Sequence, residues 1–243
     1  MASVGSVVCV CVPTFNEAGT IGELLSGVEE HCGYPLSVVV VDDGSEDGTI
    51  EIVREMAERY GNVVLVVREG KLGLGSAIVE GFRRALSLRP RPSHIVTMDA
   101  DLSHDPAEIP RLVESCVEGS VVVGSRYVEG GEIVGWSARR RAVSYVANLL
   151  ARHVGGIPLR DCTSGFRCYS SDLVGELLGG LRCGGYGIQI ETLFQAVRRG
   201  HVVTERPIRF RERRSGESKL GAEDVWGFLS LMASCLGARV ALD

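Results

Sequence analysis

Three features are missing from this sequence of 243 residues, and each absence excludes a class of protein. No stretch reaches the roughly 18 uninterrupted apolar residues that a membrane-spanning helix requires. Residues 1–5 carry no basic segment ahead of the apolar run that follows, so a secretory signal peptide is not expected. The net charge of −5 provides no basic surface for nucleic acid. We therefore expect a cytoplasmic protein that does not bind nucleic acid.

The 8 cysteines also lack a recognisable pattern, because none are spaced as Cys-x-x-Cys. This disfavours a structural zinc site. Cys9 and Cys11 lie within an apolar run, and the others are scattered along the chain. We expect these thiols to be small core residues in a reducing compartment.

The chain does contain an alternation of short apolar runs and segments with helical periodicity. The runs that predict strands are residues 7–12, 38–41, 63–67, 95–98 and 120–124. The segments that predict helices are residues 21–31, 50–60, 76–88 and 106–118. This alternation predicts an α/β fold with a mostly parallel central sheet flanked by helices.

The pattern after residue 128 is less regular. It includes an amphipathic helix at 136–153, a polar turn at 161–167, a helix opening at 187–191, a strand at 205–210 and a basic segment at 211–220. Apolar residues then recur at helical intervals. We expect a single domain at 1–220 and a carboxy-terminal amphipathic helical tail at 221–243, lying on a bilayer, a partner or its own domain.

Polar segments directly follow four of the predicted strands, at residues 13–17, 42–45, 99–101 and 124–127. Ligands of parallel sheets bind beyond the carboxyl ends of the strands. Within these segments, Asp99 and Asp101 lie two residues apart, so both carboxylates can face one point. Two adjacent anions are costly without a cation between them. We predict that they hold Mg²⁺ or Mn²⁺ together with a substrate diphosphate.

Several short motifs, in this order, resemble inverting family 2 glycosyltransferases and, among them, the dolichol-phosphate mannose synthases. They are residues 12–17, 41–45, 71–75, 98–104, 124–127, 161–167 and 216–220. The resemblance implies a GT-A type nucleotide-diphosphosugar transferase fold. It also implies transfer of mannose from GDP-mannose to dolichyl (polyprenyl) phosphate with inversion, giving dolichyl β-D-mannosyl phosphate and GDP.

The acceptor implied by this resemblance lies in a membrane. The chain resembles those relatives that are catalytic domains without transmembrane segments, anchored by small membrane partners. We therefore expect a peripheral protein on the cytoplasmic face of a membrane, with a small membrane-anchoring subunit as one candidate partner.

The resemblance assigns the nucleoside site to Pro13, Phe15, Glu17, Val41 and Asp43. Phe15 would stack on the base, although the family usually has tyrosine there, so the hydrogen bond of that hydroxyl is lost. The carboxylates of Glu17 and Asp43 can accept hydrogen bonds from the ribose and the base.

The resemblance also assigns Asp99, Ala100 and Asp101 to the sugar diphosphate, with Asp101 as the stronger metal ligand. Ser103 is a further candidate ligand, where some relatives carry glutamine.

The cationic set consists of Arg126, Arg140, Arg213 and Lys219. Guanidinium groups hold phosphate bidentately, and lysine supplies a point charge. We place Arg126 with Asp99 and Asp101 in the catalytic group. Arg213 and Lys219 lie in a segment that would close over the bound donor.

Two alternatives remain open at this point. One is a polyprenyl-phosphate glucosyltransferase that uses UDP-glucose, because the residues of the base pocket do not distinguish guanine from uracil. The other is a non-catalytic nucleotide-sugar binding protein. The paired carboxylates and the late basic segment argue against the second, since a binding protein needs no acceptor-phosphate site.

Overall fold

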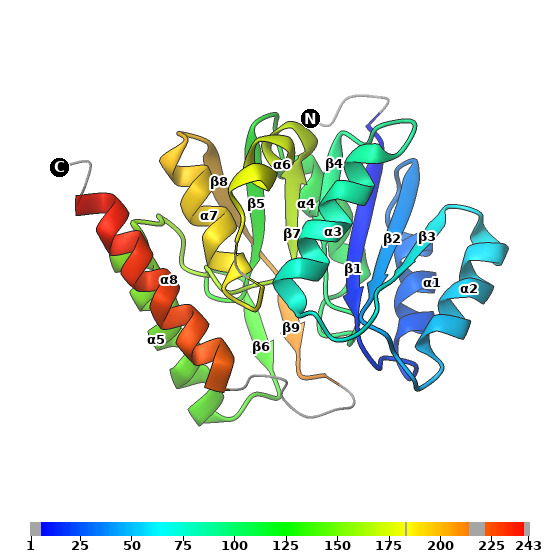
Figure 1. Ribbon diagram of the computed structural model, residues 1–243, viewed down its shortest axis with the longest axis horizontal. Coiled ribbons are helices and arrows are strands. Elements are labelled where there is room, and N and C mark those ends of the chain that lie inside the picture. Colours follow the sequence, from blue (N-terminus) through cyan, green and yellow to red (C-terminus); the bar gives the residue numbers. More distant parts are fainter. Residues whose placement is uncertain (1–5, 183, 214–221, 241–243) are drawn as a thin grey trace.

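The computed structural model describes residues 6–182, 184–213 and 222–240 (Figure 1). Its first elements are β1 (Val8–Thr14), α1 (Ile21–His31), β2 (Leu36–Asp42), α2 (Thr49–Tyr60), β3 (Val63–Val67), α3 (Leu74–Ser87), β4 (His94–Thr97), η1 (Pro106–Glu108), α4 (Ile109–Ser115) and β5 (Ser120–Ser125). The later elements are β6 (Glu132–Val134), α5 (Ala138–Gly155), β7 (Arg167–Ser170), α6 (Ser171–Leu177), η2 (Leu178–Gly180), α7 (Ile188–Arg198), β8 (Val202–Pro207), β9 (Arg209–Arg211) and α8 (Ala222–Val240).

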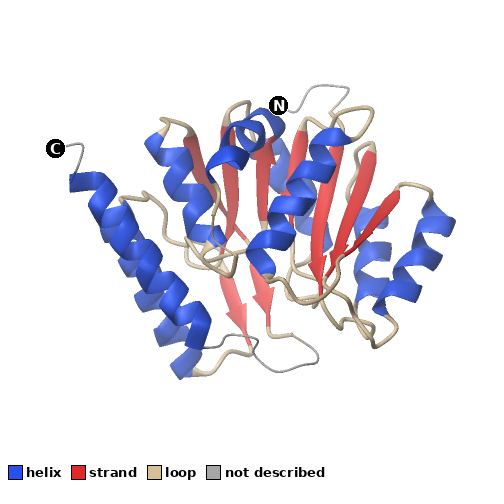
Figure 2. Cartoon of the chain, viewed as in Figure 1, coloured by secondary structure: helices blue, strands red, loops and turns tan. Residues whose placement is uncertain are grey.

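Seven strands form the main sheet, in the order β3-β2-β1-β4-β7-β5-β8. All neighbouring pairs are parallel except those that β7 makes with β4 and β5. Strands β6 and β9 pair in a separate small sheet. Helices cover both faces of the main sheet (Figure 2). The predicted α/β fold with a mostly parallel central sheet is therefore confirmed.

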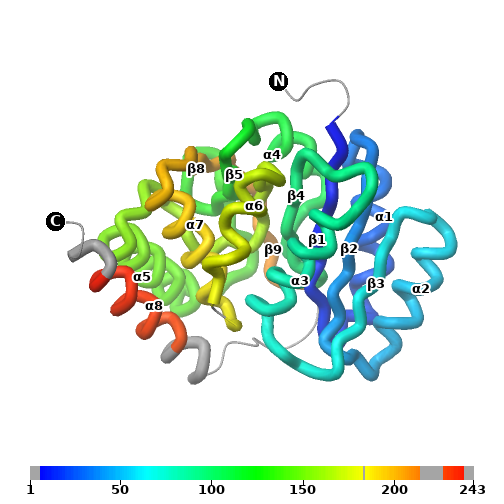
Figure 3. The backbone as a smooth tube through the Cα atoms, turned by 45° about the horizontal axis from the view of Figure 1, so that its top comes forward, coloured from blue at the N-terminus to red at the C-terminus, as the bar shows by residue number. Residues whose placement is uncertain are grey.

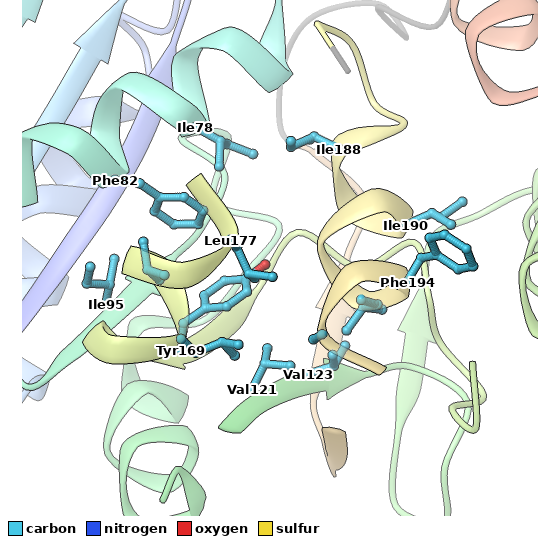
Figure 4. Packing of buried hydrophobic residues seen from close by; sticks show 14 of the residues in the cluster. Ile78, Phe82, Ile95, Val121, Val123, Tyr169, Leu177, Ile188, Ile190 and Phe194 are labelled. Atoms are coloured by element: carbon cyan, nitrogen blue, oxygen red, sulfur yellow. The ribbon is translucent and has the colours of Figure 1, made fainter. Parts of the chain in front are cut away.

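Side chains alternate along β1 between two hydrophobic cores. Val8, Val10 and Val12 pack with α1, α2 and α4, whereas Cys9 and Cys11 pack with α3 on the other face. In the second core, the rings of Phe82 and Tyr169 meet edge to face with centroids 5.3 Å apart (Figure 4). Burial on both faces explains why the strand runs are continuously apolar. The described cysteines are all buried and unpaired: Cys9, Cys11, Cys32, Cys116, Cys162, Cys168 and Cys235.

The sequence analysis was wrong at two places in the second half of the chain. Residues 205–210 do not form one strand, because β8 ends at Pro207 and β9 begins at Arg209 in the other sheet. Pro207 has no amide hydrogen with which to continue the ladder. The predicted strands also did not include β7, whose first residue, Arg167, is fully buried. A strand that begins with a buried polar residue lacks the continuous apolar run from which strands are predicted.

Helices α5 and α8 lie side by side at one end of the molecule (Figure 3). Leu231, Met232 and Cys235 of α8 are buried in the same core as residues of α7. Part of the tail therefore packs on its own domain, and the boundary at residue 220 stays a prediction. Within the described residues, no helix combines the length and apolar character needed to cross a membrane.

Candidate active site

A cavity of about 900 Å³ lies at the carboxyl ends of β1, β2 and β4. Many of the predicted site residues line it: Pro13, Phe15, Glu17, Asp43, Asp99, Ala100, Asp101 and Arg213. Residues 184–187, before α7, complete one wall. The sequence analysis did not anticipate this wall, because three of its four residues are glycines without functional side chains. Gly75 donates its amide hydrogen to Gly184 O at 2.8 Å and fastens this wall to α3.

The end of the cavity formed by β1 and β2 combines an aromatic ring with a cation. Lys71 Nζ lies 5.2 Å from the centroid of the Phe15 ring. The loop that carries Lys71 is held by Asp43, whose carboxylate accepts hydrogen bonds from Leu72 N and Gly73 N at 3.0 Å each. Arg68 forms an ion pair with the same carboxylate. Asp43 thus lines the cavity and fixes its edge, and its contact with a nucleoside stays a prediction.

Asp99 and Asp101 enter the cavity together from the end of β4. The Asp99 side chain is 40% exposed, whereas that of Asp101 is 11% exposed. Asp101 accepts a hydrogen bond from Ser103 N at 3.1 Å, and Arg213 Nε lies 3.6 Å from its Oδ2. Enclosure in the site raises the pKa of Asp99 above its ordinary value, although His104 opposes this. The protein therefore concentrates negative charge at one point of the cavity.

His104 supports this turn as a buried structural residue. Its Nδ1 accepts the backbone N–H of Asp99 at 3.2 Å. Its ring stacks on Phe166 at 5.1 Å and meets Phe210 at 5.4 Å. Burial lowers the pKa of His104. A Cβ at Gly165 would lie 3.1 Å from Asp99 Oδ1, so a larger residue there would crowd this carboxylate.

The donor set at this turn fits a divalent cation that shares its coordination with a ligand. Within the described residues there is no cluster of three or more His, Cys, Asp or Glu side chains that would hold a metal alone. Mg²⁺ is commonly held by one or two carboxylates plus substrate phosphates, and Asp99 and Asp101 supply two. Ser103 Oγ is buried and has no hydrogen-bond partner among the described residues. Ser103 does not line the cavity, but its backbone N–H donates to Asp101 Oδ1, so Ser103 stays a candidate ligand.

Arg126 does not line the cavity but is buried behind it, with 7% exposure. Its Nε and Nη2 each donate to the Asp161 carboxylate at 2.7 Å, and Nη2 also donates to Thr163 Oγ1 at 2.7 Å. Burial raises the pKa of Asp161, but the charge and hydrogen bonds of Arg126 outweigh it and hold that pKa below its ordinary value. The buried Arg126–Asp161 pair thus orders the loop before β7.

The remaining predicted residues are distributed around this site. Arg140, at the start of α5, stacks on Trp136 at 4.2 Å and pairs with Glu212 at 3.2 Å. Val41 does not line the cavity, because its position within β2 directs it into the core at 1% exposure. Lys219 lies outside the described residues.

Comparison with known proteins shows the family to which this chain belongs. A family model described as "Glycosyl transferase family 2" matches residues 9–178. The chain belongs to this family. Among its relatives is the undecaprenyl-phosphate mannosyltransferase of Micrococcus luteus, 38% identical over 218 residues that cover 88% of this chain and 87% of the relative. The polyprenol monophosphomannose synthase of Mycolicibacterium smegmatis is 37% identical over 219 residues, which cover 89% of this chain and 82% of the relative.

Solved structures also resemble this chain in fold. Glucosyl-3-phosphoglycerate synthase from Mycobacterium tuberculosis, in complex with Mn²⁺, UDP and glucosyl-3-phosphoglycerate, has a TM-score of 0.67 and 21% identity. The match covers 96% of this chain and 81% of that one. The same enzyme with Mg²⁺ and UDP gives a TM-score of 0.68 at 22% identity, covering 96% of this chain and 80% of the other. These likenesses confirm the GT-A fold.

Proposed function

We propose that the protein transfers mannose from GDP-mannose to the phosphate of a dolichyl or other polyprenyl phosphate. The products are the polyprenyl β-D-mannosyl phosphate and GDP. The observation that carries this proposal is the pairing of Asp99 and Asp101 in a cavity that Phe15 also lines. The names of the two curated relatives supply the class of sugar and the class of acceptor.

The donor would lie along the cavity from Phe15 to Asp101. Its base would stack on the Phe15 ring, beside Lys71. Its diphosphate would lie at Asp99 and Asp101, with Arg213 close by as a cationic contact. The volume of about 900 Å³ is within the range typical of small-molecule sites.

A divalent cation fits this placement, since the neighbouring solved structures hold Mn²⁺ or Mg²⁺ with UDP. Asp99 and Asp101 would hold it, with Ser103 as a further candidate ligand. The ion would neutralise charge on the GDP leaving group as that charge develops.

The chain itself needs to contribute little proton transfer to this reaction. The second pKa of a phosphate monoester is about 6, so the acceptor oxygen is already ionised at neutral pH. That oxygen forms a new bond to C1 of mannose while the bond from C1 to the diphosphate breaks, and GDP leaves with the electron pair. Attack from the face opposite the leaving group inverts C1. The protein's main contribution would be to position the two substrates in line.

Exposed apolar residues on α5 support an association with the membrane that holds the acceptor. They are Val143, Tyr145, Val146, Leu149 and Leu150. Arg139, Arg140 and Arg141 lie in the first turn of the same helix, where cations can meet anionic lipid head groups. We propose peripheral binding to the cytoplasmic face. If anionic vesicles fail to retain the protein, an anchoring subunit would be required at this surface.

The test is sugar transfer to a polyprenyl phosphate in detergent with Mn²⁺, comparing radiolabelled GDP-mannose and UDP-glucose. Metal-dependent transfer from GDP-mannose is the expected result. Transfer from UDP-glucose alone would retain the fold and mechanism but change the donor. Tight GDP binding without transfer from either donor would favour a non-catalytic nucleotide-sugar binding protein. Anomeric analysis of the product tests inversion.

A further inference from the structure

Glu212 and Arg213 are adjacent in the chain, and their opposite charges meet different partners in the site. Arg213 Nε lies 3.6 Å from Asp101 Oδ2, and Glu212 Oε1 lies 3.2 Å from Arg140 Nη1. Under the proposed function Asp101 meets the donor diphosphate, and we assign the acceptor phosphate to Arg140, a cation of the predicted set that lies outside the cavity lining. The two residues that follow β9 therefore neutralise the charges of Asp101 and Arg140 in the absence of substrates.

The backbone fixes where Glu212 lies. Strand β9 pairs with β6, and Glu212 N continues this pairing by donating to Val134 O at 2.9 Å. Gly135 follows with a φ of +92°, and a Cβ there would lie 2.8 Å from Glu212 Cβ and 3.2 Å from Oε2. Glycine thus leaves room for the Glu212 carboxylate beside the backbone. This close approach directs the carboxylate toward Arg140.

Arg140 has the surroundings of an anion-binding cation. Its guanidinium carbon lies 4.2 Å from the Trp136 ring centroid, and that of Arg126 lies 5.2 Å from the same centroid. Arg140 also lies in the first turn of α5, where the helix dipole favours negative charge. The side chains of Arg140 and Glu212 are 28% and 46% exposed, so an anion from outside can reach the pair.

We propose that Glu212 is an intramolecular competitor for the acceptor phosphate, occupying Arg140 until a phosphate monoester displaces it. This inference rests on the proposed function. A phosphate monoester carries about 1.5 to 2 negative charges at pH 7 and can bind a guanidinium bidentately. The carboxylate of a competing amphiphile carries only one charge, as Glu212 does. Its exchange for Glu212 at Arg140 therefore brings no gain in binding free energy. Glu212 thereby makes the site selective for phosphate monoesters over singly charged amphiphiles.

The test measures binding of two amphiphiles of equal chain length, a short prenyl phosphate and the matching prenyl carboxylate. Titration calorimetry compares wild type, Glu212→Gln and the control Glu132→Gln. Glu132 lies in the same small sheet and pairs with Arg209 at 2.9 Å, with its side chain 54% exposed. Because partly exposed ion pairs are weak, we expect Glu212→Gln to bind the prenyl phosphate about two- to fivefold tighter. Glu212→Gln should also bind the prenyl carboxylate measurably better than wild type does. The control Glu132→Gln should bind both amphiphiles as wild type does, and neither substitution should change the affinity for GDP.

Two different results separate failure of this inference from failure of the proposed function. If wild type binds the prenyl phosphate and Glu212→Gln binds it no better, or worse, Glu212 only positions Arg140 and the competitor role is overturned. If Arg140→Gln binds the prenyl phosphate as well as wild type does, or if wild type does not bind it, the placement of the acceptor is wrong. Circular dichroism of each variant checks that it is folded.

Discussion

The two halves of the candidate site are built differently. In the donor half, at the ends of β1, β2 and β4, backbone N–H groups donate to carboxylates: Leu72 N and Gly73 N to Asp43, and Ser103 N to Asp101. In the acceptor half, which comprises the surroundings of Arg126 and Arg140, each of these cations pairs with a carboxylate from a distant part of the chain. Arg126 pairs with Asp161 and Arg140 with Glu212, whereas Arg213 approaches Asp101 of the donor half. The first half combines backbone hydrogen bonds with the Asp43–Arg68 ion pair, whereas ion pairs between distant side chains order the second.

The largest effect is expected when a carboxylate is removed from the acceptor half. Asp161→Asn leaves the buried Arg126 without its charged partner, which should lower the free energy of unfolding by about 3–5 kcal/mol. Urea denaturation measures this change. Asp172→Asn is the matched control, because its pair with Arg91 is 3.3 Å long but exposed and should contribute less than about 1 kcal/mol. Equal effects of the two substitutions would contradict the ordering role of the buried pair.

The same pair should make stability depend on pH. The pKa of Asp161 lies below its ordinary value of 3.8, so its contribution is fully present above that value. It is lost as the pH falls through the depressed pKa of the folded state. We expect the wild type to lose stability in this acid range more steeply than Asp161→Asn does. Parallel denaturation curves across the range would show that the pair is not linked to proton binding.

In the donor half, Asp101→Asn tests catalysis rather than folding. Loss of the second carboxylate should lower the rate of sugar transfer about 10²- to 10³-fold, since stabilisation of the leaving group is lost. Transfer rates across a Mn²⁺ titration measure the effect, and the unfolding midpoint should change little. Asp105→Asn, a nearby exposed carboxylate, is the control and should keep its rate. Full activity of Asp101→Asn would show that the Asp101 carboxylate does not take part in sugar transfer.

A smaller effect, on GDP binding, is expected from substitution of Phe15 in the donor half. Phe15→Ala removes the ring that would stack on the base and should weaken GDP binding by about 1–3 kcal/mol. Phe15→Tyr keeps the ring and should bind nearly as well as wild type. Fluorescence titration with GDP compares the three proteins. If Phe15→Ala binds GDP normally, the base does not lie on this ring.

The sequence alone predicted the parallel strand core and the donor half of the site. Continuous apolar runs identified β1 to β5, and three of the segments that line the cavity, those with Phe15, Asp43 and Asp99, directly follow β1, β2 and β4. Strand β7 was missed because it begins with the buried Arg167, whose guanidinium donates to the carbonyl groups of Cys162, Ser164 and Gln189. Local patterns cannot reveal a polar residue whose partners lie in the loop before it and in a distant helix.

What the sequence determined by itself is the set of chemical groups: paired carboxylates after one strand, an aromatic ring after another, and a group of arginines in the second half. Only the tertiary structure decided which of these groups share a cavity and which neutralise one another. In the folded chain, Arg126 is buried in an ion pair with Asp161, 35 residues away, and Glu212 pairs with Arg140, 72 residues away. The physical reason is that strand ends of a parallel sheet converge by a general rule, whereas ion pairs between distant segments depend on how the whole chain packs.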